Sequence, residues 1–204
     1  MMGPRLDRLS DGSLRFTEIA PWFYSVLLEV PELLDSDQPE AVSQRLYPEP
    51  SDDEEIRESW DKYVRPDLFA LVASAREIVL KDLGNIGRIE LPPPDGLDDP
   101  MEVLGGLALW SLEIPVGHVQ AWISALNVAR LTLSTRFDVE HGDMEEQDDQ
   151  EDGVDEEDPP EFDMRTFAIT RIHLLGWIQQ MMIEEENPPP SDADAPWMPK
   201  DEDD

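Results

Sequence analysis

An amide and a guanidinium stand inside an otherwise apolar segment of this chain. The segment reads AWISALNVARLTLSTRF (121–137), and Asn127 and Arg130 lie three residues apart within it. At about 100° per residue, Arg130 falls among the apolar side chains of a helix and Asn127 falls at their edge. An unpaired buried charge is prohibitively unstable, so Arg130 must either extend outward or find a carboxylate.

Three acids are candidate partners for Arg130, because each lies beside an apolar segment that should pack nearby: Glu29, Glu32 and Glu113. A buried ion pair with one of them would fix the orientation of the helix. The alternative is that Arg130 and Asn127 anchor a ligand or a protein partner.

Other residue types that perform chemistry give weaker signals. The chain has no cysteine, and His118, His141 and His173 do not show the spacing of metal ligands. We expect His118 to be a surface or capping residue and His173 to pack in the last helix. The stretch DDQEDG (148–153) resembles a calcium-binding loop, but Pro159 stands where the bidentate glutamate belongs. No phosphate-binding loop or nucleophile motif occurs, so we expect no catalytic residue, no metal and no cofactor.

The charge balance restricts the partners of the chain. Its 204 residues carry 48 acids and 15 bases, a net charge of −33. Such a surface repels phosphate backbones and anionic lipids, so we expect no direct nucleic-acid binding and no membrane association. The first residues contain no apolar run typical of a signal peptide, and the absence of cysteine fits a reducing compartment. We expect a cytoplasmic protein.

Apolar periodicity predicts a mostly α fold. It indicates a compact domain of about five helices with a small β element of two or three strands. The expected strands lie at 12–16, 87–91 and 108–114, and the longer helices at 17–34, 52–64, 66–83, 115–137 and 164–186. The expected core joins side chains of the last three helices: Trp122, Leu126, Leu133, Leu175, Ile178, Met182, Leu71, Val72 and Val79.

Two acidic segments interrupt this pattern. Residues 138–163 contain 15 acids and no lysine or arginine, and residues 187–204 are rich in proline and acids. Such compositions bury too little apolar area to offset the entropy of ordering. We predict a single helical domain at 12–186 with a disordered acidic insertion at about 138–162, followed by a disordered tail at 187–204.

Several separated motifs together resemble a bacterial family of unknown function, DUF2017. The opening segment matches its Trp-x-x-x-x-Asn-x-x-Arg-Leu element, which here is formed by Trp122, Asn127 and Arg130. Arg45 begins RLYPEP, which matches an Arg-Leu-x-Pro element. Further matches are RFTEIAP (15–21), RPDLFALVASAREIVLKDLGNIGRIEL (65–91) and HLLGWIQQ (173–180).

The resemblance implies a small, mostly helical cytoplasmic protein without an established activity. Some members are labelled oxidative-stress regulators, but a thiol-based mechanism is impossible here without cysteine. Three carboxylates common in the family are replaced by Phe23, Val128 and Gln180, so the resemblance implies no site that needs them.

Three functions remain open from the sequence. The first is a non-enzymatic regulatory or protein-interaction module with an unidentified protein partner and an oligomeric state that the sequence leaves open. The second is an enzyme with a polar site around Arg130. The third is a transcriptional regulator of a stress response, which would need a basic face such as Arg5, Arg8 and Arg15. The candidate structural or partner-binding residues are Arg130, Asn127, Trp122 and Arg45.

Overall fold

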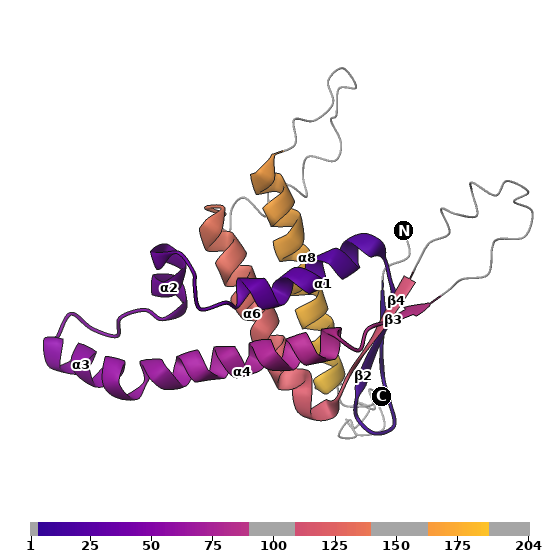
Figure 1. Cartoon of the computed structure of the whole chain (residues 1–204), viewed down its shortest axis with the longest axis horizontal. Coiled ribbons are helices and arrows are strands. Elements are labelled where there is room, and N and C mark those ends of the chain that lie inside the picture. Colours follow the sequence, from indigo (N-terminus) through magenta and orange to yellow (C-terminus); the bar gives the residue numbers. More distant parts are fainter. Residues whose placement is uncertain (1–3, 90–108, 140–162, 188–204) are drawn as a thin grey trace, which may run out of the picture.

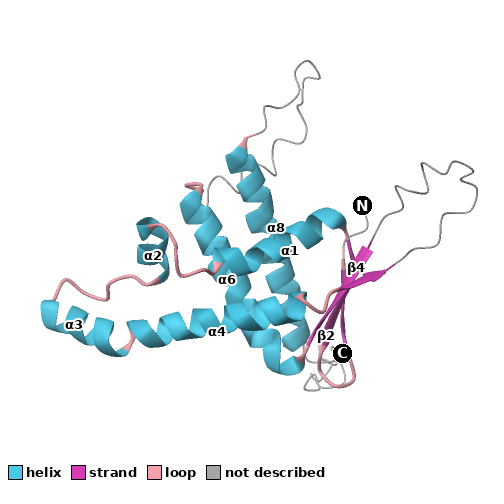
Figure 2. Ribbon diagram, in the orientation of Figure 1, coloured by secondary structure: helices cyan, strands magenta, loops and turns pink. Residues whose placement is uncertain are grey.

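The computed structural model describes residues 4–89, 109–139 and 163–187, in which helices gather beside a small sheet (Figure 1; Figure 2). The helices are α1 (Pro21–Leu33), α2 (Glu40–Leu46), α3 (Glu54–Tyr63), α4 (Arg65–Leu83), η1 (Val116–His118), α6 (Val119–Arg136) and α8 (Met164–Glu186). The strands are β1 (Arg5–Arg8), β2 (Leu14–Ile19), β3 (Gly87–Ile89) and β4 (Leu109–Ile114). The predicted mostly α fold with a small β element is confirmed, and β1 adds a strand to the three segments predicted.

The sheet has the strand order β1-β2-β4-β3, and each neighbouring pair is antiparallel. The register of β2 on β4 shifts between Phe16 and Ile19, where Glu18 has a φ of 59°. This bulge allows Ile19 to reach the core, where it is 1% exposed. Alternate side chains of β2 and β4 face the helices and are buried, as expected for a half-covered sheet: Leu14, Phe16, Leu112 and Ile114.

Helices α6 and α8 pack side by side at the centre of the core. Helix α8 begins at Asp163, whose carboxylate accepts hydrogen bonds from the backbone N–H groups of Arg165 and Thr166. The hydrogen bond from the Arg165 backbone lowers the pKa of Asp163 below its usual value. The predicted packing of α6 on α8 is confirmed, because six predicted side chains are at most 2% exposed: Trp122, Leu126, Leu133, Leu175, Ile178 and Met182.

The end of α1 fixes α4 to the bundle. Pro31 lies in the last turn of α1, and its carbonyl accepts a 2.9 Å hydrogen bond from Nε of Arg76 in α4. Arg76 also forms a 3.1 Å ion pair with Asp35, just beyond α1. C-terminal to Arg76, α4 buries Val79 completely. Arg76 therefore marks the point where α4 leaves the core.

Helix α3 and the N-terminal half of α4 form a projecting arm, which we define as residues 54–73. Figure 1 shows the arm extending to the left of the other helices. Helix α3 buries no residue, and the buried residues of α4 all lie between Ala75 and Leu83. The prediction that Leu71 completes the core is wrong, because its side chain is 61% exposed. The 19 residues of α4 span about 28 Å, and all its buried residues lie in the C-terminal half. The predicted core residue Val79 is buried there, and Val72 is half-buried against the edge of the core.

The predicted disordered segments fall almost entirely outside the described residues. The ordered core does extend slightly into the predicted insertion, because Val139 is 6% exposed and packs in the core. Two residues after α6 ends, Asp138 adopts the left-handed conformation common after helices, with a φ of 50°. Within the described residues, no helix has both the length and the apolar character needed to cross a bilayer.

Candidate functional site

Arg130 lies in a polar seam between α6 and α8. Its guanidinium donates a 2.8 Å hydrogen bond to the side-chain carbonyl of Gln179, whose amide donates a 3.1 Å bond to the backbone carbonyl of Ile123. The guanidinium also lies against Gly176, so close that a Cβ built there would be 3.2 Å from Arg130 Cζ. A mid-helix glycine therefore makes the space for the arginine.

The predicted carboxylate partner of Arg130 is wrong for the part of the chain described. Glu29 pairs instead with Arg171, and Glu113 pairs with Arg15 at 2.9 Å. Arg130 is half-buried rather than enclosed. The neutral amide of Gln179 pairs with one end of the guanidinium, whereas Nε of Arg130 is buried without a hydrogen-bond partner among the described residues.

The close contact between Arg130 and Gly176 predicts that Gly176→Ala destabilises the wild-type chain but stabilises a chain that lacks the arginine. Gly176→Ala should lower the free energy of unfolding by about 1 kcal/mol, because the new methyl group displaces the hydrogen-bonded guanidinium. In an Arg130→Ala background the same change should raise it by about 1 kcal/mol, the usual advantage of alanine over glycine inside a helix. Urea unfolding of the four chains measures both. Equal stabilisation in both backgrounds would show that the contact is absent.

The other predicted site residues do not gather around Arg130 as a site. Asn127 is exposed on α6, and Arg45 is exposed in the last turn of α2. Trp122 is 1% exposed and belongs to the core, where its indole bonds to α4 rather than to the seam. The four residues therefore occupy four different environments.

Trp122 leads to a second polar cluster that the sequence did not predict. Its indole N–H donates a 2.9 Å hydrogen bond to Asp82 of α4, a carboxylate that is 3% exposed. Nδ1 of His118 lies 3.0 Å from both oxygens of the same carboxylate. An ionised carboxylate only accepts, so His118 must carry its proton on Nδ1. The expectation that His118 is a surface or capping residue is incomplete, since it ties η1 to α4.

The remaining histidines and acids form no second cluster in the described chain. His173, expected to pack in the core, is exposed on α8, and His141 lies outside the described residues. Among residues 4–89, 109–139 and 163–187, no three histidine or acidic side chains are placed to hold a metal ion.

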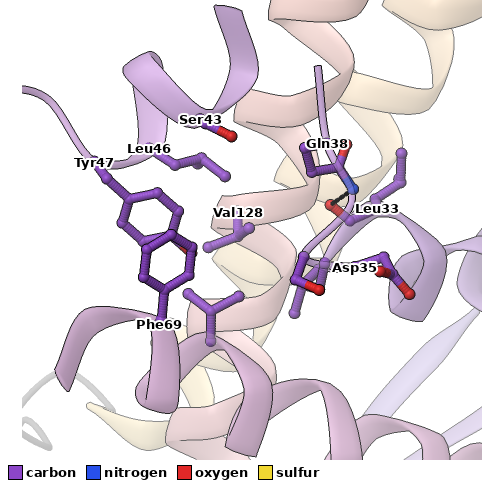
Figure 3. A pocket seen from close by; sticks show the side chains of 11 residues that line it. Leu33, Asp35, Gln38, Ser43, Leu46, Tyr47, Phe69 and Val128 are labelled. Atoms are coloured by element: carbon purple, nitrogen blue, oxygen red, sulfur yellow. Dashed lines mark hydrogen bonds between the residues drawn. The ribbon is translucent and has the colours of Figure 1, made fainter. Parts of the chain in front are cut away.

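A groove opens between the end of α1, the end of α2 and α4, beside a smaller hollow that shares Tyr47, Phe69 and Val72 with it and is drawn in Figure 3. Tyr47 and Phe69 face each other there, with ring centroids 4.2 Å apart, and Val72 also lines it. The groove has a volume of about 150 Å³ and is open to solvent. Burial raises the pKa of the Tyr47 phenol, which therefore stays neutral at ordinary pH. The lining is mixed, because three charged side chains border the groove beside its apolar and aromatic ones: Asp35, Arg76 and Glu77.

The groove borders an apolar stripe on the arm. We define the arm stripe as Val64, Leu68, Leu71 and Val72, which are spaced i, i+4, i+7 and i+8 and so share one helix face. Val64 is 36% exposed and Leu71 is 61% exposed, whereas Leu68 and Val72 are half-buried. The stripe continues the face that buries Ala75 and Val79 further along α4. From Val72 on the edge of the core, it extends the core-facing side of α4 past the core to Val64.

The sequence does carry signals for the residues that were missed. Asp82 follows Val79 by three positions, which places an acid on the apolar face of α4 just as Arg130 lies on that of α6. Gly176 interrupts a long apolar helix, where glycine costs about 1 kcal/mol without a packing role. Two such exceptions mark positions where a polar contact or a close approach is needed.

The fold and these sites define a mostly helical protein with a small antiparallel sheet and a projecting helical arm. The family model DUF2017, described as a domain of unknown function, matches residues 13–185. The chain belongs to this family, as the sequence motifs predicted. No curated protein and no solved structure matches the chain.

Proposed function

We propose that this protein is a non-enzymatic interaction module of the cytoplasm that binds a protein partner through its arm. The observation that supports this proposal most strongly is the arm stripe. Leu71 is 61% exposed although it lies on the face of α4 that forms the core elsewhere. Contiguous exposed apolar surface is unusual in soluble proteins and marks interaction sites.

Helix α3 adds to the apolar surface of the arm. Ile56 is 49% exposed and Tyr63 is 63% exposed, and the helix buries no residue of its own. A helix that contributes nothing to the core gains little stability from the fold. Its apolar side chains are better explained by a partner than by the packing of the domain.

The arm is also held firmly at its base, which favours binding. Arg76 bonds to the Pro31 carbonyl and to Asp35, so the direction in which α4 leaves the bundle is set by two contacts from α1. A preformed surface loses less entropy on binding than a flexible one. The arm therefore presents its stripe in a defined orientation.

The polar seam supports an enzyme less well. The Arg130 guanidinium is packed against the Gly176 backbone and bonded to Gln179. Arg130 lines neither the groove nor the smaller hollow beside it. A reacting group needs a concave polar site with room for a substrate, whereas this guanidinium lies directly against Gly176 and Gln179.

Leu71→Ser should remove partner binding without unfolding the protein. The side chain is mostly exposed, so the free energy of unfolding should change by less than about 0.5 kcal/mol. The wild-type chain is used to capture proteins from extracts of the native cell. The amount of each bound protein should be about tenfold lower with the variant, which corresponds to a loss of about 1.4 kcal/mol of binding energy. Quantitative mass spectrometry of the captured proteins measures this ratio.

Leu28→Ser is the matched control, because Leu28 is a 43% exposed leucine of α1 outside the arm. The same proteins should be captured by this variant and by the wild type. If Leu71→Ser retains every protein that Leu28→Ser retains, the arm is not the binding surface.

A further inference from the structure

We infer that the segment bound by the arm is a basic amphipathic helix of another protein. This inference rests on the proposed function and adds the chemistry of the partner. It follows from the charge that surrounds the arm stripe and from the spacing of the stripe itself.

The part of the chain that carries the stripe is acidic. Residues 35–77, which run from the end of α1 through the arm, contain twelve acids and five bases, a net charge of −7. Three of the five bases are already paired with acids of the same region: Arg57 with Glu49 and Glu54, Arg65 with Asp61, and Arg76 with Asp35. The field over the arm is therefore negative, and it attracts lysine and arginine side chains.

The same charge disfavours a second copy of the chain as the occupant. Two arms packed against each other would bring two regions of −7 together. Like charges placed across an interface cost several kcal/mol and select against the pairing. A partner with basic flanks gains from the field that a second copy would oppose.

The stripe has the spacing with which one helix recognises another. Val64, Leu68, Leu71 and Val72 repeat at i, i+4, i+7 and i+8, so they form a ridge along one side of the arm. An amphipathic helix packs such a ridge between its own apolar side chains, which recur at i, i+3, i+4 and i+7. The groove beside Phe69 shares Val72 with the stripe. It is bordered by the acids Asp35 and Glu77, so it suits a side chain with an apolar stem and a basic end.

Synthetic peptides test the chemistry of the partner directly on the full chain. The probe is a helix of about 18 residues, five turns, with leucine on one face and lysine on the other. One comparison peptide replaces every lysine by glutamate, and a second has the same composition as the probe but no apolar face. Fluorescence anisotropy should show that the probe binds at least about tenfold more tightly than either comparison peptide, and more weakly as salt is raised.

Variants of the chain locate that binding. Leu71→Ser should lower the affinity for the probe peptide about tenfold. Leu28→Ser should bind the probe peptide with the affinity of the wild type. The scrambled peptide guards against simple attraction to the acidic segments elsewhere in the chain. Equal binding of probe and scrambled peptide, or equal binding by wild type and Leu71→Ser, would overturn the inference.

The remaining outcomes separate this inference from the proposed function. Tighter binding of the glutamate peptide, or a dimer of the chain in native mass spectrometry that Leu71→Ser dissolves, would overturn a basic partner. Either result would leave the arm as an interaction surface. The proposed function itself is contradicted only if Leu71→Ser also captures the same proteins as the wild type.

Discussion

Leu126→Ala should lower the free energy of unfolding by about 2–5 kcal/mol, the range for a fully buried leucine. Leu126 is 0% exposed in α6, in the same core cluster as Leu175 and Ile178 of α8. The substitution removes apolar contacts and leaves a cavity that the tightly packed interface of two long helices closes only in part. Urea denaturation followed by circular dichroism measures the change.

Leu71→Ala is the control for that measurement, because it makes the same chemical change at a leucine that is 61% exposed. It should alter the free energy of unfolding by less than about 0.5 kcal/mol. Similar losses at the two positions would mean that the arm packs in the core, and the proposed binding surface would then not exist.

Asp82→Ala should destabilise the protein by about 3 kcal/mol, because it leaves the buried indole N–H of Trp122 without an acceptor and also removes the bond from His118. Asp82→Asn keeps one acceptor oxygen at the same place but presents an N–H to the second donor. It should cost less, about 1–2 kcal/mol. Thermal and urea unfolding should rank the wild type as the most stable, Asp82→Asn next and Asp82→Ala as the least stable.

Glu77→Ala controls for the removal of an acid from the same helix, since Glu77 is exposed on α4. Its effect should stay below about 0.5 kcal/mol. A wild-type stability for Asp82→Ala would contradict the structural role of the cluster.

Periodicity predicted the long helices, and it predicted the packing of the core correctly where α6 meets α8. Trp122, Leu126 and Leu133 of α6 pack on α8 as the pattern indicated, because both helices are long and apolar over the same span. The pattern on α4 was equally clear, yet Leu71 is exposed. Periodicity identifies the apolar face of a helix, but whether anything covers that face depends on the lengths and crossing points of its neighbours.

The polar sites show a second limit of prediction from sequence. The position of Arg130 on an apolar face correctly indicated that it needs a partner, but Gln179 lies 49 residues away and belongs to a different helix. Carboxylates were the expected partners because a fully buried charge requires one, and Arg130 is only half-buried. Tertiary packing sets how deeply Arg130 is buried, and at half-burial its partner is an amide where a carboxylate was predicted.

The arm and its acidic surroundings illustrate what sequence composition does predict. The overall charge of −33 by itself argues against nucleic acid and anionic membranes as partners. The fold adds an exposed apolar stripe within a part of the chain, residues 35–77, that itself carries a net charge of −7. Composition therefore indicates the charge of a suitable partner, whereas the surface proposed to bind it depends on where α4 leaves the core.

Photo-crosslinking in the native cell tests the central claim most directly. A photoreactive phenylalanine analogue is placed at Leu71 of the arm stripe or, as the matched control, at Leu28 of α1, both exposed leucines of helices. We expect irradiation to produce a crosslinked band from position 71 that contains a second, different protein, and no such band from position 28. Crosslinks of equal yield from both positions, or none from position 71, would contradict the account of the arm as the surface that binds the partner.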